Sequence, residues 1–157
     1  MILLRALPAA GRDNGLVQGD GGNDLTTIEL LVLHEAGGCN DLGNAYGAVQ
    51  LYSVFEELDE LLDSVEGALV RLFDLGLIRL VETTAEIGYK VHHAELPVLS
   101  RERLVEELAR ERDPTDRTRD TMIFYDPTPE GEALLDSVPE DSIPRVSGRV
   151  RRPWMER

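Results

Sequence analysis

The chain has 157 residues, which suits one domain with tails and is too short for two ordinary domains. Its 30 acidic residues outnumber 16 basic ones, and the net charge of −14 argues against a simple nucleic-acid coat protein. A single cysteine, Cys39, rules out an intrachain disulfide and favours a reducing, cytoplasmic setting. Arg5 and Pro8 interrupt the apolar start, so we expect no signal peptide, membrane span or membrane partner.

Residues 1–23 are predicted to be a flexible leader, because the stretch 9–23 is rich in Gly, Asp and Asn and buries too little apolar area. Asp24 is expected to cap a first helix whose apolar residues are Leu25, Ile28, Leu31 and Val32. The helix should end at Gly37-Gly38, where glycine tolerates a left-handed C-terminal conformation. The glycine- and asparagine-rich segment 38–47 is predicted to be a loop.

Two further helices are expected after this loop. The first covers residues 48–62, with an apolar side of Val54, Phe55, Leu58, Leu61 and Leu62. The pair Asp63 and Glu66 resembles a capping box and predicts a new helix over residues 64–75, which stops at Gly76. Its buried stripe is predicted to be Val65, Ala68, Leu69, Leu72 and Phe73.

Strands are predicted at residues 77–82 and 120–125, where branched and aromatic residues gather. Thr128 and Pro129 are typical of a helix start, so a last short helix should follow the second strand. Between the strands lies an insertion, residues 84–119, with an extended stretch at 89–92. It also contains a helix from Ser100 to Arg112, with an Arg103–Glu107 pair and a narrow stripe of Leu104, Val105 and Leu108.

The order helix, helix, helix, strand, strand, helix resembles the winged-helix domains of MarR-like and PadR-like bacterial regulators. In those families the third helix commonly runs into a turn like Leu75-Gly76-Leu77-Ile78, and the second strand into a turn like Thr128-Pro129-Glu130-Gly131. The resemblance implies an α+β winged helix-turn-helix domain over residues 24–138. Three helices would precede a small antiparallel wing with a helical insertion, and a C-terminal helix would follow. The long wing connection and the glycine-rich loop depart from the family pattern.

The resemblance further implies a non-enzymatic, homodimeric transcriptional regulator that binds double-stranded DNA through its third helix. That helix would expose Arg71 as its only convincing donor, beside Glu66, Gly67, Val70 and Asp74, and the preceding segment 56–63 is acidic. Because carboxylates repel phosphates, DNA binding is expected to depend on scattered arginines. These are Arg71 in the third helix, Arg117 and Arg119 in the wing, and Arg149, Arg151 and Arg152 in the tail.

The alternative is an acidic winged-helix module that binds a basic protein partner and does not contact DNA directly. Its contact residues would be Glu56, Glu57, Glu60, Glu66 and Trp154. Trp154 belongs to a basic C-terminal tail, residues 139–157, in which five arginines stand against Glu156 from Pro144 onwards. Such a tail is typical of an interaction element and equally of a disordered, solubilising end.

The sequence predicts no enzyme, cofactor or metal site. His92 and His93 would point to opposite faces of a strand, and His34, Cys39 and Asp41 lack a metal-ligand spacing. The acidic run 56–60 is expected to be a solvated helix face. For the homodimer, the expected contacts are helix 100–112 or the terminal helix, because each has an apolar stripe without an obvious partner in the chain.

Overall fold

The computed structural model describes residues 16–18, 24–37, 40–52, 57–88, 96–113 and 120–143. This part of the chain is α+β, with six α-helices and two small antiparallel sheets. In chain order the elements are β1 (Leu16–Gln18), β2 (Asp24–Thr26), α2 (Thr27–Ala36), β3 (Asn40–Asp41), α3 (Leu42–Tyr52), α4 (Leu58–Asp74), β4 (Ile78–Thr83), α5 (Ala85–Gly88), α6 (Arg101–Glu111), β5 (Met122–Pro127), α7 (Pro129–Ser137) and the 3-10 turn η2 (Glu140–Ser142). Among the described helices, none combines the length and hydrophobicity that a membrane crossing requires.

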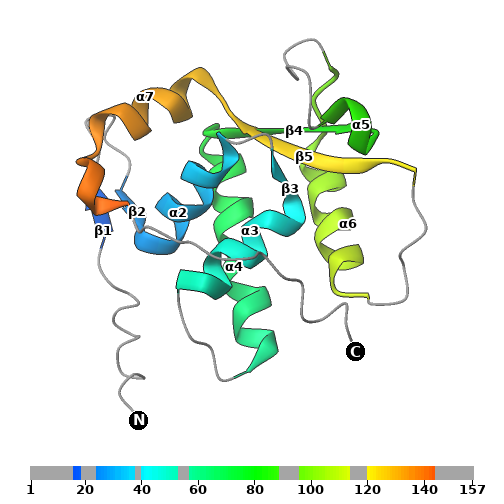
Figure 1. The fold of residues 1–157 in the computed structure, drawn as a ribbon, viewed down its shortest axis with the longest axis horizontal. Helices are drawn as coiled ribbons and strands as arrows, with labels where there is room; N and C mark the ends of the chain where they lie inside the picture. Colours follow the sequence, from blue (N-terminus) through cyan, green and yellow to red (C-terminus); the bar gives the residue numbers. More distant parts are fainter. Residues whose placement is uncertain are drawn as a thin grey trace.

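The larger sheet has three strands in the order β3-β5-β4, and both pairings are antiparallel. Tyr125 in the central strand lies opposite Leu80 on one side and Asn40 on the other. Both predicted strands are confirmed, each displaced by one or two residues from its expected range. The β4–β5 ribbon runs along one side of the molecule, and α2, α4 and α6 lie below it in Figure 1.

Helix α2 forms the centre of the core, since Leu30, Leu31, Val32 and Leu33 are all fully buried. It contacts α3 and α4 as well as β5 and α7, so it has almost no solvent-facing side. The predicted cap at Asp24 is wrong. Thr26 caps the helix instead, because its hydroxyl accepts a bond from Glu29 N while Glu29 accepts one from Thr26 N.

Two other expectations at the ends of α2 need correction. Asp24 and Leu25 belong to strand β2, which pairs with β1 inside the segment predicted to be a flexible leader. At the other end, Gly37 has φ of −71° and so does not adopt the left-handed conformation, while Gly38 lies outside the described residues.

The predicted loop 38–47 is wrong, since strand β3 and the first half of α3 occupy residues 40–47. Asp41 accepts a bond from Asn44 N and so caps α3, and Asn40 donates to Glu35 O at the end of α2. Gly43 and Gly47 are buried, because their small size suits a helix packed closely in the core. Side-chain capping and packing outweigh the low helix propensity of this stretch.

The predicted boundary between the second and third helices is also wrong. Helix α3 ends at Tyr52 and α4 begins at Leu58, so the predicted helix 48–62 spans two elements. Asp63 and Glu66 lie inside α4 and do not cap it. The helix starts earlier because Glu60 accepts a bond from Glu57 N, and because Leu61, Leu62 and Val65 continue one buried stripe.

The predicted helix end at Gly76 and the predicted helix start at Thr128 are both confirmed, and the structure joins them. Gly76 stops α4 with φ of +74°, a conformation that favours glycine. Thr128 caps α7 through Gly131 N, and its hydroxyl also donates to Gly76 O at 2.6 Å. A Cβ atom at Gly131 would lie 2.2 Å from Leu77 O, so only glycine fits this close approach.

Candidate interaction surface on helix α4

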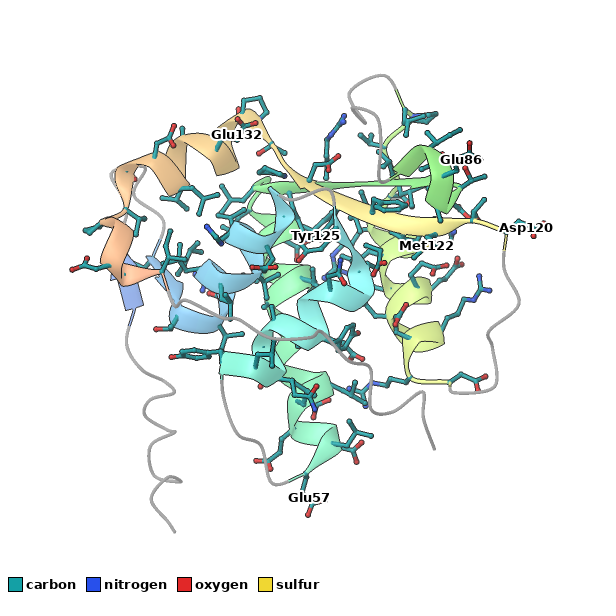
Figure 2. All side chains as sticks on the ribbon, viewed as in Figure 1. Glu57, Glu86, Asp120, Met122, Tyr125 and Glu132 are labelled. Atoms are coloured by element: carbon teal, nitrogen blue, oxygen red, sulfur yellow. The ribbon has the colours of Figure 1, made fainter. Side chains whose placement is uncertain are left out.

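One side of α4 is buried and the opposite side faces solvent. The buried stripe predicted from the sequence is confirmed for Val65, Ala68, Leu69 and Leu72, while Phe73 is half-buried. We call the solvent-facing residues the α4 face: Asp59, Glu60, Asp63, Gly67, Arg71 and Asp74. Four of these six residues are acidic and one is basic. Glu57 extends the acidic character to the outer tip of the helix, which projects away from the sheet in Figure 2.

Arg71, the only basic residue of the α4 face, is held by α2 and the strand before it. Its Nη1 donates to both carboxylate oxygens of Glu29, at 2.7 and 2.8 Å, and its Nη2 donates to Asp24 O at 3.0 Å. The Glu29 side chain is only 8 % exposed, so Arg71 supplies the counter-charge for a buried carboxylate. The guanidinium is therefore a structural tie between α2 and α4.

Helix α6 lies along α4 on the flank away from α2, as Figure 1 shows. At one end of the contact, Arg101 Nε donates to Asp74 Oδ1 at 2.9 Å and Arg101 Nη2 donates to Asp74 Oδ2 at 3.2 Å. This paired hydrogen bond lowers the pKa of Asp74 and raises that of Arg101, although both side chains are well exposed. The bond therefore links the start of α6 to the end of α4.

At the other end of the contact, Arg112 binds two carboxylates of α4. Its Nη2 donates to Glu66 Oε1 at 3.0 Å and to Asp63 Oδ1 at 2.6 Å, and its Nε donates to Glu66 Oε2. The hydrogen bond to Glu66 is the main cause of the raised pKa of Arg112. The start of α6 thus contacts the end of α4, and the end of α6 contacts the middle of α4, so the two helices run antiparallel.

Between these two ends, α6 contributes Leu104 and Leu108 to the hydrophobic core. Its Glu107 is 1 % exposed and is neutralised by its own helix, because Arg103 lies 3.1 Å and Arg110 3.3 Å away. The predicted Arg103–Glu107 pair is confirmed. Arg103 also donates to Glu82 of β4, which is the main cause of its raised pKa.

The reason given for a dimer contact at helix 100–112 or at the terminal helix is wrong. Leu104 and Leu108 of α6, and Leu134 of α7, are all buried within the chain. Only Val105 of the predicted α6 stripe is exposed. Both helices therefore use their apolar stripes inside the fold, and a homodimer remains a prediction without this support.

The residues predicted for DNA or partner binding are only partly brought together. Arg71, Glu57, Glu60 and Glu66 all lie on α4, where Arg71 and Glu66 are ion-paired and Glu57 and Glu60 are exposed. The remaining predicted residues lie outside the described ranges: Glu56, Arg117, Arg119, Arg149, Arg151, Arg152 and Trp154. Cys39, Tyr89, His92, His93 and Glu95 also lie outside them.

Reasoning from the sequence did not find that Arg101 and Arg112, at the two ends of α6, bind the surface of α4. A signal for them exists, because Arg101, Leu104, Leu108 and Arg112 are spaced by three, four and four residues and so share one helix face. The prediction concentrated on the leucines and did not include the arginines at each end.

Within the described ranges, no group of three or more His, Cys, Asp and Glu side chains has the arrangement to hold a metal ion.

Tyr125 lies in the interior beneath β5 (Figure 2), where burial, and then the charges of Glu35 and Asp41, raise its pKa well above the ordinary value. Tyr125 is therefore a neutral core residue at physiological pH.

Comparisons with protein-family models, with curated proteins and with solved structures found no match to this chain. The function is therefore argued from the α4 face and its neighbours.

Proposed function

We propose that the chain is a winged-helix regulatory protein whose helix α4 binds a basic protein partner and does not read DNA. The observation that carries this proposal is the state of the α4 face. Its one arginine is bound to Glu29 and Asp24 O, and its remaining charged groups are carboxylates.

The order of the strands supports the winged-helix part of the proposal. Strand β3 follows the first helix of the domain, and β4 and β5 follow the third, in the sheet order β3-β5-β4. A winged-helix domain places its third helix, here α4, toward its ligand. Helix α6, inserted between β4 and β5, would then be an elaboration of the wing.

Electrostatics support the choice of a protein partner. A helix that enters the major groove places its exposed side chains next to phosphates and base edges, where arginine and lysine are favoured and carboxylates are repelled. On α4, the exposed acids Asp59, Glu60 and Asp63 would meet that phosphate charge. A partner that carries arginines would instead find acceptors of matching geometry.

The proposal is tested with two fluorescent probes, a duplex DNA and a helical peptide with arginines along one face. The full chain is compared with the variant Glu57→Gln/Glu60→Gln, which removes two exposed acids. We expect the variant to bind the peptide at least threefold more weakly and to bind DNA no differently from the full chain. A tenfold gain in DNA affinity in this variant would mean that α4 approaches DNA, and the proposal would then be wrong.

A second function, DNA binding through arginines outside α4, is favoured by the same strand order. The residues for it are Arg117, Arg119, Arg149, Arg151 and Arg152. Phosphate contacts predict a steep loss of DNA affinity with salt. This second function would be supported if the variant Arg149→Ala/Arg151→Ala/Arg152→Ala lost its DNA affinity while Arg71→Ala kept it.

A further inference from the structure

We infer that α6 is a displaceable clamp, which occupies on α4 the place that an arginine-bearing helix of the partner takes. This inference rests on the proposed function, because it assumes that α4 is the surface that binds the partner. It assigns α6 the role of an internal competitor for that surface.

The geometry of the contact is that of one helix bound to another. Asp63 and Asp74 are eleven residues apart on α4, and Arg101 and Arg112 are eleven residues apart along the chain of α6. At a rise of 1.5 Å per residue, each interval spans about 16 Å, so two antiparallel helices bring both pairs together. Leu104 and Leu108 fill the interval between the two arginines.

The chain topology allows α6 to leave without disrupting the sheet. Helix α6 lies within the connection between β4 and β5, and the six-residue pairing from Ile78–Pro127 to Thr83–Met122 does not involve it. Just before α6, the backbone of the connection is bonded to β4, since Leu99 N donates to Leu80 O at 2.8 Å. In the described ranges α6 thus meets the β4–β5 ladder through a side chain, the bond from Arg103 to Glu82 at 2.8 Å, and not through the backbone pairing itself.

The charges also suit reversible docking. Glu107, the buried acid of α6, is neutralised by Arg103 and Arg110 of the same helix, so it keeps those two partners when α6 moves. The acids that Arg101 and Arg112 would release are partly in water: the exposed fraction of the side chain is 74 % for Asp63, 46 % for Asp74 and 23 % for Glu66. Release therefore leaves no fully buried carboxylate unpaired; Glu66 and Glu82, which lose their bonds to Arg112 and Arg103, are half-buried and within reach of water.

The partner that fits this surface is an amphipathic helix with the sequence stripe of α6. That stripe is an arginine, a leucine three residues later, a second leucine after four more, and an arginine after a further four. Such a helix in another protein would meet Asp74, the apolar flank of α4, and then Glu66 and Asp63 in the same order. Because α6 is tethered, the partner competes against a high effective concentration.

The test follows amide hydrogen exchange in the full chain and the binding of a labelled peptide of residues 100–113 added in trans. The variant Arg112→Ala removes one end of the clamp. Its matched control, Arg79→Ala, removes the same charge and one ion pair, to Asp126 at 3.6 Å, away from α6. We expect Arg112→Ala to speed exchange in α6 at least tenfold over β4 and β5, and to bind the peptide at least threefold more tightly than the wild type.

Unchanged exchange in α6, or equal peptide affinity for the wild type and Arg112→Ala, would overturn the clamp. The variant Asp63→Asn/Glu66→Gln should loosen α6 in the same way. It should not bind the peptide more tightly than the wild type, because it lacks the two carboxylates that accept from the arginine. A gain in peptide affinity in this variant would contradict the proposed binding site. If Arg112→Ala does not fold, Arg112→Lys keeps the charge but loses the paired geometry and should give a smaller shift of the same sign. If the α4 face bound no basic probe, the proposed function would be wrong. The hydrogen-exchange result would still show whether α6 detaches from α4.

Discussion

Helix α4 is held on both flanks by arginine–carboxylate pairs, but the two flanks differ in burial. Toward α2, Arg71 binds Glu29, whose side chain is 8 % exposed, beside a core of fully buried leucines. Toward α6, Arg101 and Arg112 bind acids whose side chains are 23 to 74 % exposed, beside two leucines. Pairs with a buried member are costly to break, whereas exposed pairs contribute little and are screened by salt. The first flank therefore builds the fold, and the second can respond to conditions.

The largest expected difference between the flanks concerns their leucines. Leu31→Ala in α2 should lower the free energy of unfolding by about 3–5 kcal/mol, because it leaves a cavity at a fully buried position. Leu108→Ala in α6 should lower it by less than half as much if α6 can detach before the core unfolds. Chemical denaturation measures both values. Equal losses would show that the two flanks unfold as one unit.

A smaller effect is expected from the ion pair on the α2 flank. Arg71→Ala leaves Glu29 without its guanidinium, and we expect a loss of about 1–2 kcal/mol in the free energy of unfolding, nearly independent of salt. The control Arg79→Ala breaks the longer pair with Asp126 and should cost less than half of this. The same denaturation series at low and high salt checks the prediction. A loss in Arg71→Ala that disappears at high salt would mean that the pair behaves as an exposed one.

The smallest effect is a pH dependence at the α6 flank. The hydrogen bond from Arg101 lowers the pKa of Asp74 in the folded state. The ion pair therefore stabilises the docked helix fully at pH values above the unfolded-state pKa of Asp74, about 3.9. This stabilisation is lost as the pH falls through the folded-state pKa. Carboxyl titration by NMR should place Asp74 below its ordinary value in the wild type and return it there in Arg101→Ala. Hydrogen exchange in α6 should stay constant from pH 7 to about pH 5 once the intrinsic rate is corrected. A change in that corrected rate within this range would point to another titrating group.

Local signals in the sequence predicted a large part of the fold. The turn at Gly76, the cap at Thr128 and the branched and aromatic residues of β4 and β5 are local signals, and the structure has a turn, a cap and two strands at these places. The start of α6 at Ser100 was predicted for the same reason, since its hydroxyl accepts a bond from Arg103 N.

Features that depend on distant contacts were not predicted. The stretch 38–47 has poor helix propensity, and its residues 40–47 form strand and helix because Asn40 pairs with Tyr125 and Asp41 caps α3. Likewise, the charge of Arg71 could be read from the sequence, but its partner Glu29 lies 42 residues away. The charge on the α4 face was thus predictable, whereas the partners that hold those charges were not.

The junction of Gly76, Leu77, Thr128 and Gly131 fixes one end of the β4–β5 ribbon. Thr128 donates to Gly76 O through its hydroxyl and to Leu77 O through its backbone N–H, and Gly131 lies directly against Leu77 O. The opposite end, where Thr83 pairs with Met122, opens into the connection that contains α6. Because one end of the ribbon is fixed in this way, the connection at the other end can carry a whole further helix, α6, while α4 and α7 keep their places.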